Sequence, residues 1–152
     1  MDNQFESVKR TYYVKKRFKN RNIKKLNVNN LQMIYVASKL KGDIEGDIEA
    51  NIEKAKKYCK FVHDKGLMPV ASHIMYPAIG FNDEVEEERE KCRLYGLYLL
   101  AVCDALYCFV ENDEISDGMK AEIDTAKKLN IPIKYFRVLE DGIYEYTGSR
   151  CN

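Results

Sequence analysis

The sequence predicts a single α/β domain in which helices cover both faces of a largely parallel sheet of four or five strands. Short apolar runs rich in strand-forming residues alternate with longer stretches of helical periodicity along most of the chain. Strands that are separated by helices pair in parallel, with the helices lying on the faces of the sheet. The length of 152 residues suits one compact core, and the 45% hydrophobic content is typical of a folded globular protein.

The first strand is predicted at Met33–Ser38, an apolar run that ends before a turn containing Gly42 and Gly46. A helix is then predicted from Asp47, a candidate N-cap, to the breaker Gly66. Its apolar positions recur at three- and four-residue spacing, as in an amphipathic helix. They are Ile48, Ile52, Ala55, Cys59 and Val62.

A second strand is predicted at Leu67–Ser72, and Pro69 favours an edge position because proline donates no ladder hydrogen bond. A loop is expected to follow. It contains His73, Tyr76, Pro77 and Gly80. The acidic segment Asp83–Glu90 predicts the start of the next helix, because negative charge offsets the positive end of the helix dipole. That helix is expected to continue through Ala101.

The third strand is predicted at Ala105–Val110 and is followed by a polar turn and a helix at Asp117–Leu129. A further strand is predicted at Ile131–Phe136, and Gly142–Tyr146 is a candidate edge strand. Right-handed crossovers place the first strand beside the third, with the chain winding away in opposite directions from that pair. This is the flavodoxin/Rossmann-like, doubly wound class, in which ligands bind at the carboxyl ends of the strands where the winding reverses.

Polar residues follow both of these central strands, so they are expected to line a common crevice. The candidate binding residues after the first strand are Ser38, Lys39, Lys41 and Gly42, and those after the third are Asn112, Ser116, Gly118 and Met119. Ser116 and the free amides of its helix can bind a phosphate or sugar hydroxyl, and the lysines can add positive charge. Equally, Ser116 can simply cap the helix, and Glu122 can be a solvated helix residue.

Two further candidates lie in the predicted loop after the second strand. His73 can act as an acid, a base or a phosphate donor near neutral pH, or can merely satisfy local backbone groups. Tyr76 can stack on a base or serve as ordinary packing.

Charge divides the chain into a basic extension, residues 1–32, and a mildly acidic domain, residues 33–152. The extension has nine lysine and arginine residues against Asp2 and Glu6. Because aromatic residues lie among these cations, the extension can bind nucleic acid through phosphate contacts and base stacking. The alternatives are a solvated arm, or an extra strand packed on the sheet or on a second subunit.

Several classes of protein and site are not indicated by the composition. No apolar run approaches the roughly 20 residues of a membrane span, and no secretory signal follows Lys9 and Arg10, so a cytoplasmic location is expected. Five cysteines without a C-x-x-C pair indicate reduced thiols rather than a disulfide framework or zinc site. With two histidines, no metal and no cofactor are expected.

The spacing of Ser116, Gly118 and Glu122 resembles that of the nucleoside 2-deoxyribosyltransferase-like superfamily, which includes nucleoside 5′-monophosphate N-glycosidases. The resemblance spans roughly Met33 to Phe136 and is closest to small domains often encoded on phages and mobile elements. Their pattern is matched by Ser38, by the Asn51 and Ala55 spacing, and by Pro69 with His73.

The resemblance implies a glutamate nucleophile at Glu122 and a second catalytic candidate at Asp104, at the junction that enters the third strand. It also implies a nucleoside or nucleotide ligand and a homodimer or higher homo-oligomer. The chain differs from characterised members in two places: no carboxylate lies between Arg93 and Cys103, and Lys39 and Leu40 replace an aromatic residue. The expectation is therefore an N-glycosidic bond hydrolase or transferase, with a non-catalytic nucleotide-derivative binding protein and a nucleic-acid-associated protein as alternatives.

Overall fold

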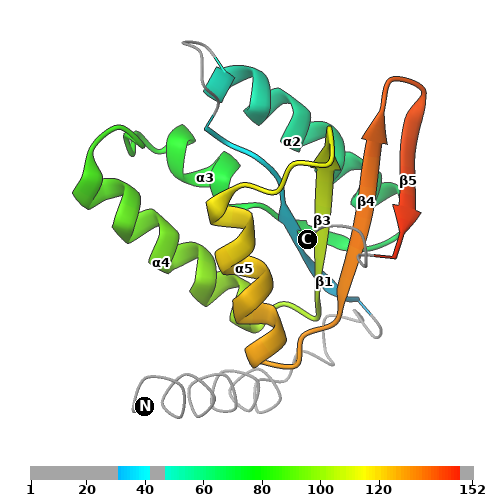
Figure 1. The fold of residues 1–152 in the computed structure, drawn as a ribbon. Helices are drawn as coiled ribbons and strands as arrows, with labels where there is room; N and C mark the ends of the chain where they lie inside the picture. Colours follow the sequence, from blue (N-terminus) through cyan, green and yellow to red (C-terminus); the bar gives the residue numbers. More distant parts are fainter. Residues whose placement is uncertain (1–30, 42–46, 148–152) are drawn as a thin grey trace.

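The computed structural model describes residues 31–41 and 47–147, which form a five-stranded sheet in the order β2-β1-β3-β4-β5 (Figure 1). The strands are β1 (Met33–Ala37), β2 (Met68–Val70), β3 (Ala105–Glu111), β4 (Ile133–Leu139) and β5 (Gly142–Tyr146). β1 pairs in parallel with both β2 and β3, β3 pairs in parallel with β4, and β5 is antiparallel to β4. The predicted α/β class is confirmed, as are the edge position of the second strand and the pairing of the first with the third.

Helices cover both faces of the sheet, as a doubly wound chain with right-handed crossovers requires (Figure 1). Helix α2 (Asp47–Asp64) packs on one face, and α4 (Glu86–Val102) and α5 (Asp117–Lys128) pack on the other, where the short α3 (Ser72–Ala78) precedes α4. The chain winds in opposite directions from β1 and β3. Their carboxyl ends therefore form the switch point of this fold, where the described polar loops meet.

The core consists of two layers, one on each side of β1 and β3. Along β3, Leu106, Cys108 and Val110 face α4 and α5, whereas Tyr107 and Phe109 face α2. This alternation follows from the two-residue period of a strand, and both sets are buried because both faces are covered. The near-continuous apolar run that predicted the strand is the signature of such double burial.

On the α2 side the core is largely aromatic. Phe109 stacks on Tyr58 at a centroid distance of 4.6 Å and on Phe136 at 5.2 Å, and Phe61 meets both phenylalanines edge to face. The buried residues of α2 are Asn51, Ala55, Tyr58 and Val62, so the predicted apolar stripe is displaced around the helix. The polar groups of Asn51 and Tyr58 tolerate this position because the Leu40 carbonyl and Glu111 are their partners.

The structure corrects several predicted boundaries. The second strand ends at Val70, and the predicted loop from His73 is helix α3, which contains Pro77 one residue before its end. Helix α4 begins at Glu86, and β4 runs to Leu139, beyond the predicted end at Phe136. Gly66, at a φ of +76°, follows the end of α2 as predicted.

Some predictions fall outside the described residues. They are the basic extension 1–32 in all but its last two positions, the binding candidate Gly42 and the fifth cysteine, Cys151. The cysteines of the described ranges, Cys59, Cys92, Cys103 and Cys108, are free thiols. None of the helices in 31–41 and 47–147 combines the length and apolar character needed to cross a membrane.

Candidate active site

A pocket of about 560 Å³ lies at the carboxyl ends of β1 and β3, on the face covered by α4 and α5. We call it the larger pocket. It is lined by the residues after β1, by the first turns of α3 and α5, and by α4. The predicted site residues that it brings together are Ser38, Lys41, His73, Tyr76, Ser116, Gly118, Met119 and Glu122. Eight of the predicted positions thus converge, although they come from three separate segments of the chain.

Glu122 is a partly buried residue of α5 and lines the larger pocket. The hydroxyl of Tyr35 donates a hydrogen bond to its Oε1 atom at 2.9 Å. Burial raises the pKa of Glu122 from 4.5 to about 7, although the bond from Tyr35 acts in the opposite direction. The carboxyl group therefore exchanges its proton near neutral pH, which is the range in which a general acid or base works best.

Tyr35 is fully buried in β1, and its hydroxyl also meets the Ser72 hydroxyl at 2.7 Å. Burial and, next, the charge of Glu122 raise the pKa of Tyr35 well above 10, so the phenol stays protonated. Gly96 of α4 packs directly over this pair. A Cβ at Gly96 would approach both the Tyr35 hydroxyl and the Ser72 Oγ to 3.0 Å. A side chain there would displace one of the two hydroxyls.

His73 joins the end of β1 to α3, because its Nε2 lies 2.9 Å from the Ser38 Oγ. Burial lowers the pKa of His73 from 6.5 to about 4, so its ring is neutral at neutral pH. A neutral imidazole can donate or accept a hydrogen bond in the larger pocket. It does not supply the positive charge that a phosphate contact through His73 would use.

Ser116 is the N-cap of α5, and its Oγ accepts a hydrogen bond from the Met119 amide at 3.3 Å. The capping role considered in the sequence is therefore confirmed, and the residue also lines the larger pocket. Gly118 lies in the first turn of α5 at a φ that is not positive, and the nearest neighbour of a Cβ there would be the Ser116 Oγ at 4.0 Å, an ordinary contact. Glycine is not required by the backbone at this position.

Replacing Ser116 with alanine is expected to lower the free energy of unfolding by about 1 kcal/mol, because the cap of α5 is lost. Denaturant unfolding measures this change. Ser116→Asp is the matched variant, since aspartate caps helices as well as serine does. If the hydroxyl also contacts a ligand, Ser116→Asp should recover the stability but not the ligand binding. If aspartate recovers both, the role of Ser116 is to cap α5 and not to bind the ligand.

An aromatic wall closes one side of the larger pocket. The Tyr76 ring packs edge-on against Phe81 at 6.0 Å and lies 5.5 Å from Tyr95, and Tyr76 and Phe81 both line the pocket. Tyr76 thus has a packing role and also presents a surface to the pocket. Charged residues of both signs also line the larger pocket: Lys41, Asp83, Arg89, Glu90, Arg93 and Asp117.

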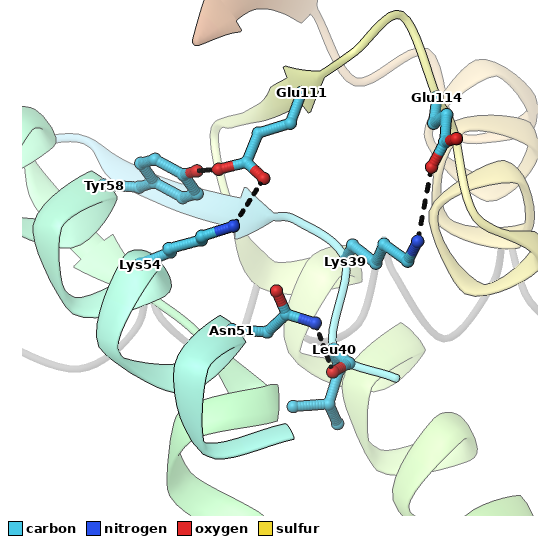
Figure 2. Close-up of polar contacts among 7 residues, drawn as sticks. All are labelled: Lys39, Leu40, Asn51, Lys54, Tyr58, Glu111 and Glu114. Atoms are coloured by element: carbon cyan, nitrogen blue, oxygen red, sulfur yellow. Dashed lines mark hydrogen bonds and ion pairs between the residues drawn. The ribbon is translucent and has the colours of Figure 1, made fainter. Parts of the chain in front are cut away.

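A smaller pocket of about 180 Å³ lies on the other face of the sheet, between α2 and the ends of β1 and β3. Figure 2 shows its polar groups paired with one another: Lys39 contacts Glu114 at 3.3 Å, and Lys54 contacts Glu111 at 2.8 Å. Lys39 and Asn112 line this smaller pocket, although the sequence placed them with Glu122. The reason is that Lys39 pairs with Glu114, a partner far away in the sequence (Figure 2).

The structure also corrects the predicted placement of Asp104 beside Glu122. Its Oδ2 accepts a hydrogen bond from the Met33 amide at 2.7 Å, at the amino ends of β1 and β3. Because the two strands are parallel, their amino ends lie at the opposite end of the sheet from the larger pocket, which is at their carboxyl ends. The side chain is exposed and connects two strand starts, and the structure does not bring it together with Glu122.

The sequence interpretation missed Tyr35, Ser72, Phe81 and Gly96. The hydroxyl of a tyrosine inside an apolar strand needs a hydrogen-bond partner. That requirement was the one feature of the sequence that could have indicated a polar contact at Tyr35. The pocket also has carboxylates at Asp83 and Glu90, ahead of the Arg93–Cys103 stretch that has none. Within the described residues, no three histidine, cysteine or carboxylate side chains are grouped to hold a metal ion.

Residues 32–136 match the model of a protein family described as a domain of unknown function (DUF7768), and this span exceeds half of the chain. The chain belongs to this family. The DUF7768 domain of this protein extends from β1 into β4 and includes every residue that lines the larger pocket. No curated protein matches the sequence.

Among solved structures, the 2-deoxyribosyltransferase from the psychrotolerant bacterium Bacillus psychrosaccharolyticus is similar to this chain, with 18% identity and a TM-score of 0.48. The match covers 69% of this chain and 72% of that chain. At this distance the likeness assigns neither an activity nor a substrate to the DUF7768 domain.

Proposed function

We propose that this protein cleaves or transfers the N-glycosidic bond of a nucleoside- or nucleotide-like ligand, with Glu122 as the nucleophile. The observation that carries the proposal is the position of Glu122: a partly buried carboxylate, bonded by Tyr35, that faces a pocket at the switch point of a doubly wound sheet. The spacing of Ser116, Gly118 and Glu122, interpreted in the sequence as that of an N-glycoside enzyme, supports the same assignment.

The chemistry follows from where charge develops. As the bond between the anomeric carbon and the base nitrogen breaks, its electron pair leaves with the base, and the sugar carbon becomes positive. A Glu122 oxygen then bonds to that carbon as a glycosyl ester. The departing base takes up a proton from water. Attack by water, or by a second base, with loss of a proton to solvent, then releases the sugar and restores the carboxylate. Water as the acceptor gives hydrolysis, and a second base gives transfer.

The larger pocket has the dimensions and surfaces that such a ligand needs. Its volume of about 560 Å³ is within the range of small-molecule sites. In the proposed pose the base packs against the aromatic wall of Tyr76 and Phe81, and the sugar lies over Glu122. Ser38 and His73 are then available to hydrogen-bond sugar hydroxyls as neutral groups.

The direct test is base release from a panel of nucleosides, deoxynucleosides and their 5′-monophosphates, each with and without a free acceptor base. We expect release from at least one member by the native protein and none by Glu122→Ala. A member that stabilises the protein against heat but is never processed would instead support the non-catalytic binding protein. If no member is bound or cleaved, the proposal fails.

The rate of base release should rise with pH and level off above about pH 7, because only the ionised carboxylate attacks carbon. Glu122 has a pKa of about 7, so lowering the pH by one unit below that value should cost about tenfold in kcat/KM. A pH series of kcat/KM measures this. A profile that is flat from about pH 5 to pH 8 would contradict the role of Glu122 as nucleophile.

A further inference from the structure

The Tyr35 hydroxyl is the middle member of a chain of three hydrogen-bonding groups. It lies 2.7 Å from the Ser72 Oγ and 2.9 Å from Glu122 Oε1. A phenol has one hydrogen to donate, so it cannot donate to both neighbours at once. The direction of the two bonds is therefore coupled.

When Glu122 is ionised, it can only accept, so the hydrogen of Tyr35 must point to it. Ser72 must then donate its own hydrogen to the Tyr35 oxygen. When Glu122 is protonated, the chain can reverse, with the carboxylic acid donating to Tyr35 and Tyr35 donating to Ser72. Because linked hydrogen bonds polarise one another, a donor at Ser72 makes Tyr35 a better donor to the carboxylate.

The surroundings hold this chain in place. Tyr35 is fully buried, and Ser72 is 6% exposed at the start of α3. Gly96 of α4 leaves the space in which the two hydroxyls meet, since a Cβ there would lie 3.0 Å from each oxygen. Buried polar groups with these partners keep a single geometry, because an unpaired hydroxyl in the core is costly.

We propose that Ser72 is a positioning residue: acting through Tyr35, it orients a hydrogen toward Glu122 and thereby favours the ionised carboxylate. Its catalytic consequence rests on the proposed function, whereas the hydrogen-bond chain does not. Ser72 lines the larger pocket, but the proposed effect passes through its bond to Tyr35 and needs no contact with the ligand. Its effect is on the fraction of Glu122 that is ready to react.

Other charged and titratable groups also face Glu122 across the larger pocket, and they are kept constant in the test. They are Lys41 after β1, His73 and Tyr76 of α3, Asp83 before α4, Arg89, Glu90, Cys92 and Arg93 of α4, and Asp117 of α5. A change confined to Ser72 removes no charge. A shift in the titration of Glu122 therefore reports on the hydrogen-bond chain.

The experiment follows the carboxyl ¹³C signal of Glu122 against pH by NMR in protein labelled at glutamate, with Glu122→Gln identifying the signal. The native apparent pKa is expected near 7. Tyr35→Phe should raise it by about one unit or more, because a hydrogen bond to the charged form is lost. Ser72→Ala should raise it in the same direction by roughly half a unit, and Ser72→Thr, which keeps a hydroxyl, should restore it.

An unchanged pKa in folded Ser72→Ala would overturn the proposal, as would a shift that Ser72→Thr does not reverse. If Ser72→Ala does not fold, Gly96→Ala disturbs the same pair from α4, and it must also raise the pKa of Glu122. In protein that releases base, the midpoint of the kcat/KM profile should move with the NMR value. If the pKa of Glu122 shifts as expected in these variants but the native protein releases no base, the proposed function is refuted and the hydrogen-bond chain is still supported.

Discussion

Replacing Glu122 with glutamine is expected to abolish base release while making the folded protein more stable at neutral and higher pH. Glutamine keeps the shape of the side chain but cannot form the glycosyl ester, so the loss in kcat should be at least about 10³-fold. The rate of base release, measured on the best substrate of the panel, checks this. The hydrogen bond to Tyr35 can be kept, because the amide oxygen of glutamine still accepts it.

The stability gain follows from the pKa of Glu122. Its value is about 7 in the folded protein and 4.5 in the absence of the fold, so between these values the folded state binds more protons. Stability therefore falls as the pH rises from 4.5 to about 7, by up to about 3 kcal/mol, and stays low above that range. Glutamine never ionises and escapes this cost.

Denaturant unfolding at about pH 8 and about pH 5 measures the gain, which should be large at the higher pH and small at the lower. Asp124→Asn is the matched control, because this carboxylate is on the same helix but exposed, and it should change little at either pH. A Glu122→Gln variant that is less stable than the native protein at about pH 8 would contradict the burial of an ionisable carboxylate at this position.

Replacing Phe109 with alanine is expected to give the largest loss of stability, about 3–5 kcal/mol. The ring is 2% exposed and contacts Tyr58, Phe61 and Phe136, so its removal leaves a cavity in the centre of the α2 side of the core. Because β3 leads directly into the loop before α5, loosening of this strand should also weaken ligand binding. Denaturant unfolding, followed by thermal shift with the best ligand, measures both effects.

Phe81→Ala is the informative comparison. Phe81 is partly exposed on the wall of the larger pocket, so its removal should cost less stability than that of Phe109. It should nevertheless weaken ligand binding by roughly 1–3 kcal/mol if a base stacks on this wall. Equal losses of stability from the two variants would mean that the aromatic core is not organised around Phe109. If Phe81→Ala leaves ligand binding unchanged, the base does not pack against this wall and the proposed pose is wrong.

The architecture was predictable because it depends on local periodicity and on chain direction. The apolar runs at β1 and β3, the turn at Gly66 and the cap at Ser116 each identify an element, and right-handed crossovers then order the strands. That ordering was enough to bring Ser38, His73, Ser116 and Glu122 to one pocket. Helix α3 was missed because it is only one or two turns long and contains Pro77.

The contacts within the site were less accessible, because they join residues that are far apart in the sequence. The pairing of Lys39 with Glu114 assigns that lysine to the smaller pocket, and no local pattern indicates it. Tyr35 lies within an apolar strand, as an ordinary core residue does. Gly96 lies in the middle of a helix, where no turn indicates that a glycine is needed. Asp104 is different: as the residue before a parallel strand it belongs at the edge opposite the pocket, so chain direction already argued against its placement beside Glu122.

The central claim is that the Glu122 carboxylate bonds covalently to the sugar. Its most direct test is to mix the protein with the substrate that the panel identifies, quench the reaction in acid and measure the mass of the peptide that contains Glu122. We predict that this peptide gains the mass of the glycosyl group, and that the gain disappears in Glu122→Gln. Base release by the native protein with no adduct on Glu122, or with the adduct on another residue, would contradict the claim.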